Sequence, residues 1–116
     1  MALLNGFYFL AWLLFIFKER TIMNITQQDD GKHGAFIAQA EGKQAGEMTY
    51  TWAGETMFII DHTDVDEAFK GQGVGRRLLD AAVAFAREKN IKILPLCPYA
   101  KSEFDKDSSI HDVLRT

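Results

Sequence analysis

The chain has 116 residues, of which 47% are hydrophobic, which is enough material for one hydrophobic core and too little for two. Its formal net charge is -3 and its charges are mixed along the sequence, so it lacks the basic stripe that a nucleic-acid partner requires. Cys97 is the only cysteine, which excludes an internal disulfide and favours a reducing compartment, the cytoplasm.

The first 22 residues differ in composition from the rest of the chain. Residues 2–17 are uncharged and rich in aromatic side chains, and Lys18-Glu19-Arg20 follows them. A membrane span needs about 20 apolar residues, so this segment is short, and its charges stand on the wrong side for a cleaved signal peptide. Two interpretations stay open. Either translation begins at Met23, or the segment anchors a domain that Lys18 and Arg20 keep on the cytoplasmic side. We expect one domain over residues 23–116, with a membrane as partner only if residues 2–17 insert.

The first half of this domain predicts antiparallel strands. Alternating β-branched and apolar residues are interrupted by turn-forming residues at Asp29-Asp30-Gly31-Lys32, around Gly42 and at Gly54-Glu55. The two middle runs are separated by a loop of hairpin length over 41–45, and the fourth run is apolar enough to be a central strand. The strands are expected at residues 24–28, 34–40, 46–53 and 56–65.

The second half predicts a helix and a parallel strand. Apolar residues recur with helical spacing at Leu78, Leu79, Ala82, Phe85 and Ala86, which indicates an amphipathic helix over 75–89 that Asn90 caps. A short buried strand is expected at 91–96, parallel to the strand before the helix. One or two short helices should follow, anchored by Phe104, Ile110, Val113 and Leu114. The fold class is α/β (α+β), with a mixed antiparallel and parallel sheet and a crossover helix.

A glycine-rich loop stands between the fourth strand and this helix. Gly71, Gly73 and Gly75 allow a tight turn whose backbone N–H groups converge on an anion at the positive end of the helix, and Lys70 and Arg76 add mobile positive charge. A pyrophosphate is the ligand that suits this arrangement. The spacing fits neither the dinucleotide-binding fingerprint nor the P-loop. The bland alternative is a turn that only reverses the chain.

The segment from Val65 to Leu78 resembles the acetyl-CoA motif of the GNAT N-acetyltransferase superfamily. Lys70 stands where that family has Arg or Gln, and the glycines match in full. The resemblance implies a minimal GNAT-like fold, acetyl-CoA as cosubstrate and transfer of its acetyl group to an unidentified amine. The residues that it assigns to the coenzyme are Val65, Lys70, Gly71, Gln72, Gly73, Val74, Gly75 and Arg76.

A narrower resemblance concerns the small YjdJ-type GNAT-like subfamily. It rests on Ile60-Asp61-His62-Thr63 and on Leu94-Pro95-Leu96-Cys97-Pro98-Tyr99-Ala100, and it covers about residues 24–104. Such domains resemble ordinary GNAT proteins without their substrate-binding helices. This chain likewise has no helical pattern between its first two expected strands, so we expect an open acceptor site.

Three residues near the ends of the two parallel strands are candidates for chemistry. We expect Cys97 and His62 to be neighbours, so that the thiol attacks the thioester and the imidazole takes a proton; alternatively His62 assists direct attack by the amine. Tyr99 would protonate the leaving thiolate, as the resemblance implies. The bland alternatives are a buried small side chain at Cys97, a solvated or salt-bridged surface histidine at His62 and a packing residue at Tyr99. No histidine has a second ligand beside it, so we expect no metal site. A non-catalytic acetyl-CoA sensor and a membrane-tethered interaction domain stay open as rival functions.

Overall fold

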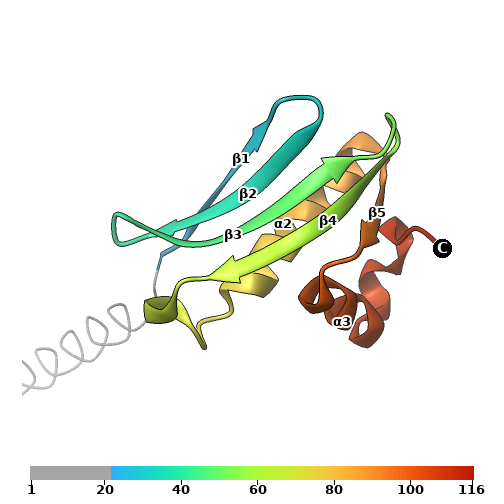
Figure 1. Cartoon of the computed structure of the whole chain (residues 1–116). Coiled ribbons are helices and arrows are strands. Elements are labelled where there is room, and N and C mark those ends of the chain that lie inside the picture. Colours follow the sequence, from blue (N-terminus) through green and yellow to red (C-terminus); the bar gives the residue numbers. More distant parts are fainter. Residues whose placement is uncertain (1–21) are drawn as a thin grey trace, which may run out of the picture.

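The computed structural model describes residues 22–116 (Figure 1). The hydrophobic segment 2–17, for which we weighed an anchor against a start at Met23, lies outside the described residues, and both interpretations stay predictions. Within residues 22–116, no helix combines the length and the apolar character that a membrane crossing needs.

Five strands form one mixed sheet in the order of the sequence, β1-β2-β3-β4-β5. Strands β1 to β4 pair with one another antiparallel, and β5 pairs parallel with β4, as expected. The strands are β1 (Asn24–Asp29), β2 (His33–Ala40), β3 (Lys43–Trp52), β4 (Met57–Val65) and β5 (Lys92–Pro95).

The hairpin between β2 and β3 is tighter than the loop over 41–45 that we expected. Only Glu41 and Gly42 form the turn, with φ values of 54° and 73°. Two successive residues with positive φ match the right-handed twist of antiparallel strands, so the strands can pair right up to the turn. β3 therefore begins at Lys43, before the predicted position.

Four helical segments follow β4: η1 (Glu67–Phe69), α2 (Val74–Lys89), α3 (Pro98–Lys106) and η2 (Ser108–Val113). The predicted apolar stripe of α2 is confirmed, since Leu78, Leu79, Ala82 and Ala86 are buried and Phe85 packs against the core. The predicted cap is confirmed too, because Asn90 adopts the left-handed conformation at φ 56° and donates its N–H to Ala86 and Arg87 carbonyls. Phe104, Ile110 and Val113 anchor the tail in the core, and Leu114 packs against it.

The core lies between the sheet and α2. Aromatic rings from β2, β3, β4 and α2 pack there, with Tyr50 and Phe58 only 4.4 Å apart between ring centroids. The helix α2 crosses behind the strands in Figure 1, with α3 and η2 beside β5. No helix of the described residues covers β1 to β4 on the opposite face, so that face of the sheet is open. The expected open acceptor site stays a prediction.

Candidate functional site

A β-bulge in β4 decides which side chains face the helix. The register between β3 and β4 shifts from the pair Tyr50–Ile60 to the pair Thr49–His62, so Asp61 is an extra residue in β4. Strict alternation from the buried Ile60 would place His62 on the side of α2. Because of the bulge, Thr63 takes that side opposite the buried Met48, and His62 faces the open side with Thr49.

The two parallel strands part where this bulge begins. Their ladder ends at the pair Ile60–Pro95, and the amides of Leu96 and Cys97 then both donate to the Ile60 carbonyl, at 3.2 and 3.0 Å. Beyond that point β4 continues to Val65 paired with β3 and no longer with β5, while the segment after β5 turns into α3, whose first residue is Pro98. The parting creates an opening at the carboxyl ends of two parallel strands, where ligands of α/β sheets bind.

A groove with a volume of about 530 Å³ leads away from this opening. Its walls are the end of β4 from Thr63 to Val65, the loop with Phe69, Lys70, Gly71 and Gly73, the start of α2, and Tyr99 of α3. Of the residues predicted to bind a coenzyme, Val65, Lys70, Gly71, Gly73, Val74 and Gly75 therefore line one groove. Gln72 lies in the same loop, where its N–H donates to the Phe69 carbonyl at 3.3 Å.

The loop needs glycine at two positions. Gly71 has φ 81° and Gly73 has φ 74°, and a Cβ built on either would meet no atom within 4 Å. Their backbones are therefore open to an incoming group. Gly73 is the N-cap of α2 and offers no side chain to the first turn, whose amides have no acceptor within the helix. This loop can bind an anion through backbone N–H groups.

The two basic residues of the loop differ in how they are held. Lys70 pairs with Glu67 at 2.8 Å, and both side chains are exposed, so the pair exchanges readily with solvent or a ligand. Arg76 pairs with Asp80 at 2.9 Å, Asp107 at 2.5 Å and Glu103 at 3.5 Å. The expectation that Arg76 supplies mobile charge is wrong, because these carboxylates on α2 and the tail hold its guanidinium.

Tyr99 lies across the groove from the loop and touches its third glycine. A Cβ built on Gly75 would lie 2.9 Å from Cζ of Tyr99, so this position needs glycine for space. Burial and the negative charge of Glu103 raise the pKa of Tyr99 to about 12. The phenol is consequently protonated at neutral pH and can donate its proton to a group in the groove.

Cys97 is only 3% exposed and lies behind the groove. Its Sγ is 3.2 Å from the Oγ1 of Thr63, which lines the groove. The structure thus pairs Cys97 with Thr63, and the expected neighbour His62 faces the open side of the sheet. The bulge at Asp61 is the physical reason for this correction.

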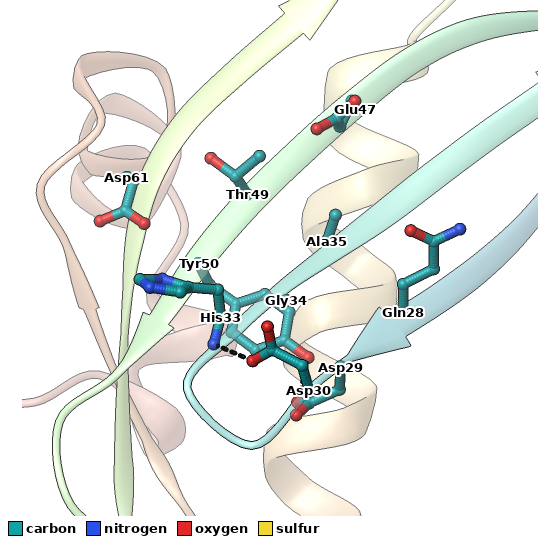
Figure 2. Close-up of a pocket in the computed structure, with 10 residues that line it drawn as sticks. All are labelled: Gln28, Asp29, Asp30, His33, Gly34, Ala35, Glu47, Thr49, Tyr50 and Asp61. Atoms are coloured by element: carbon teal, nitrogen blue, oxygen red, sulfur yellow. Dashed lines mark hydrogen bonds between the residues drawn. The ribbon is translucent and has the colours of Figure 1, made fainter.

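The open face carries a second cavity, of about 450 Å³ (Figure 2). Asp29, Asp30, Glu47 and Asp61 line it together with His33, and its described lining residues include no lysine or arginine. In Figure 2 the side chains of Asp61, Thr49 and Glu47 stand on the near face of the strands, with α2 behind them. His62 faces this side next to Asp61.

Sequence reasoning missed three residues around the groove: Thr63, Glu103 and Asp107. Glu103 could have been predicted from the sequence, because it stands four residues after Tyr99 on one helix, a spacing that brings side chains together. Thr63 was hidden by the bulge, and Asp107 reaches Arg76 from 31 positions away. No three histidine, cysteine or acidic residues within 22–116 are grouped so as to hold a metal ion.

The chain is similar in sequence and in fold to known proteins. Residues 35–113 match the family described as GCN5-related N-acetyl-transferase. A GCN5-like protein from Staphylococcus aureus, solved by NMR, is 36% identical, with a TM-score of 0.63 over 79% of this chain and 87% of that one. Protein NATD1 of Xenopus tropicalis is 29% identical over 66% of this chain and 71% of its own length.

One similar fold contains the coenzyme. A GNAT family acetyltransferase from Elizabethkingia anophelis, solved with acetyl-CoA bound, has a TM-score of 0.58 over 72% of each chain. Its sequence is only 14% identical, so this likeness concerns the fold alone.

Proposed function

The chain belongs to the GCN5-related N-acetyltransferase family, and from this premise we propose that it binds acetyl-CoA in the groove beside Gly73 and transfers the acetyl group to an amine. The observation that carries the proposal is the position of two positive-φ glycines directly before α2, at the mouth of a groove that ends at Thr63 and Tyr99. The similar fold solved with acetyl-CoA bound supports acetyl-CoA as the ligand.

The residues present fit the coenzyme's chemistry. Gly71 and Gly73 leave open space that any Cβ would occupy, so phosphates can approach the backbone closely. The amides of the first turn of α2 would hold the pyrophosphate, and Lys70 would exchange Glu67 for it. The groove then directs the remainder of the coenzyme toward the parting of β4 and β5, where Thr63 and Tyr99 lie.

We place the acetyl transfer at this parting, with Cys97 as nucleophile. The Cys97 sulfur attacks the thioester carbon, the bond from that carbon to the coenzyme sulfur breaks, and Tyr99 supplies a proton to the departing thiolate. The Cys97 proton replaces the one that Tyr99 gave, so the products are acetyl-Cys97 and coenzyme A. An amine then takes the acetyl group and restores the thiol. Direct attack by the amine is the second route.

The acceptor amine would arrive over the open face of the sheet. The acidic residues there, among them Glu47 and Asp61, attract a protonated amine. His62 faces the same side and would take the proton that an ammonium group must lose before it attacks. His62 thus serves the acceptor in this proposal, while Thr63 is the neighbour of the thiol.

Intact-protein mass spectrometry of the full chain with acetyl-CoA tests the proposal, alongside calorimetric titration of the same sample. We expect binding and a single acetyl adduct, which an added amine removes. Cys97→Ala should lose the adduct and keep the affinity, because the phosphate contacts lie in the loop. His62→Ala is the matched control, since it should keep the adduct and slow only its transfer to the amine.

The other outcomes are equally informative. Coenzyme A release with an amine but without an adduct would select direct transfer. Binding without release to any amine tried would identify a coenzyme sensor, and absence of binding would contradict the proposal as a whole.

A further inference from the structure

Arg76 follows Gly75, the last glycine of the loop proposed to bind the coenzyme (the coenzyme loop). Its guanidinium, however, pairs with three carboxylates. Its Nε lies 2.9 Å from Asp80, its Nη2 2.5 Å from Asp107 and its Nη1 3.5 Å from Glu103. Two of these carboxylates belong to the segment after β5, so Arg76 ties the start of α2 to the tail of the chain. Three carboxylates around one guanidinium leave an environment that repels a further anion.

Glu103 connects these contacts of Arg76 to Tyr99. The Tyr99 hydroxyl is 3.5 Å from Oε1 of Glu103, the oxygen that Arg76 also approaches. On the other side, the Tyr99 ring rests on Gly75, the residue before Arg76. The ring is therefore held between the backbone of the coenzyme loop and a carboxylate whose position Arg76 fixes.

We propose that Arg76 is a positioning residue, whose guanidinium braces Glu103 and the tail so that Tyr99 stays against Gly75 at the groove. It does not bind the coenzyme's phosphates. The inference rests on the proposed function, in which Tyr99 gives its proton to the departing thiolate. It replaces the role that the motif suggests for this side chain, and it explains why the loop leaves phosphate binding to backbone amides and Lys70.

The charges that face Tyr99 agree with this role. Glu103 approaches it from α3, while Arg76 and Asp80 approach it from α2, and Asp107 reaches it only through Arg76. Asp64 and Lys70 line the same groove from the end of β4 and the loop. The Glu103 charge raises the pKa of Tyr99 and the Arg76 charge lowers it. Arg76 therefore also limits the rise in the Tyr99 pKa.

Asp107→Asn separates the two roles, because they predict different changes in the acetyl-CoA Kd. Oδ2 of Asp107 holds Arg76, and Oδ1 caps the amide of Ser109, a cap that asparagine keeps. If Arg76 is a brace, the variant loosens Tyr99 and changes the acetyl-CoA Kd by less than about twofold. If Arg76 binds phosphate, freeing it tightens the Kd by about tenfold or more.

The position of Tyr99 can be read directly by NMR. A ring against Gly75 displaces the Gly75 Hα resonance, and Tyr99→Ala removes that displacement while Tyr99→Phe keeps it. We expect Asp107→Asn and Arg76→Met each to lose most of the displacement, and the double variant to lose no more than either one. Asp105→Asn is the matched control on α3, because it breaks only the exposed pair with Lys101.

A Gly75 Hα displacement that survives both variants, or a tighter Kd in Asp107→Asn, would overturn the inference. Neither measurement needs an acceptor amine or turnover. If Tyr99→Phe left acetyl transfer unchanged, the proton-donor step of the proposed function would fall, and the NMR result would still decide whether Arg76 holds the ring.

Discussion

The glycines of the coenzyme loop serve different physical needs. Gly71 and Gly73 have positive φ and open space beyond Cα, whereas Gly75 lies under the Tyr99 ring with no left-handed backbone. A side chain at Gly73 therefore strains the backbone and fills the open space in which we propose that the coenzyme binds, and a side chain at Gly75 displaces Tyr99.

Substitution at Gly73 should affect coenzyme binding beyond its effect on folding. Gly73→Ala and Gly54→Ala both place alanine at positive φ, 74° and 84°, with no atom within 4 Å of the new Cβ. Each should lower the unfolding free energy by about 1 kcal/mol. We expect only Gly73→Ala to weaken acetyl-CoA binding in calorimetric titration, because Gly54 lies in the turn between β3 and β4. Equal affinities in the two variants would contradict the backbone cradle.

The neighbours of the Cys97 thiol could not be predicted from the local sequence pattern alone. The sequence correctly placed His62 near the end of β4 and Cys97 shortly after β5, and the groove gathers Tyr99 of α3 with the loop. It could not reveal that Asp61 forms a bulge, because a bulge depends on the pairing with β3. That one extra residue exchanges His62 for Thr63 as the neighbour of Cys97.

At the scale of elements, the strands, the crossover helix and its cap were all predictable, because each has local signals. Periodicity located α2 to within one residue at its start, and Asn90 marked its end. The short 3₁₀-helix η1 was missed. It depends on Asp66, whose side chain accepts from the amide of Ala68 at 2.9 Å inside what reads as a loop. Such short segments have too few residues for a periodic signal.

The cap of α2 gives a prediction about stability. Asn90 has φ 56°, a conformation that glycine adopts without strain and alanine does not. Asn90→Ala should lower the unfolding free energy by about 1 kcal/mol, and Asn90→Gly should leave it within about 0.5 kcal/mol of the parent chain. Urea denaturation followed by circular dichroism measures both. An Asn90→Ala chain as stable as Asn90→Gly would show that the left-handed cap does not matter.

At the scale of the whole molecule, ion pairs connect the coenzyme loop and α2 to the tail. Arg76 pairs with Asp107, and Arg87 pairs with Asp112 at 2.9 Å. These contacts join segments that are far apart in sequence, so no local pattern predicts them. The open face of the sheet is likewise a property of the assembled fold, since it follows from where the helices do not pack (Figure 1).

This connection should make stability depend on pH in the acid range. Hydrogen bonds from Ser109 and Arg76 lower the pKa of Asp107 from 3.8 to about 2. A carboxylate with a depressed pKa stabilises the fold above its unfolded pKa, and that contribution is lost as the pH falls. The unfolding free energy should therefore decrease between about pH 4 and pH 2, and less steeply in Asp107→Asn. Urea denaturation across this range measures both slopes, and equal slopes would contradict the assignment.

The central claim is that the groove beside the glycine loop holds acetyl-CoA, and an amide NMR titration of the full chain with acetyl-CoA tests it most directly. We expect the largest shifts at the amides of Gly71, Gly73, Val74 and Gly75, with smaller ones at Thr63 and Tyr99. Amides around Glu47 and Asp61 on the open face should move little until an amine is added. Shifts confined to the open face, or no shifts at saturating acetyl-CoA, would contradict it.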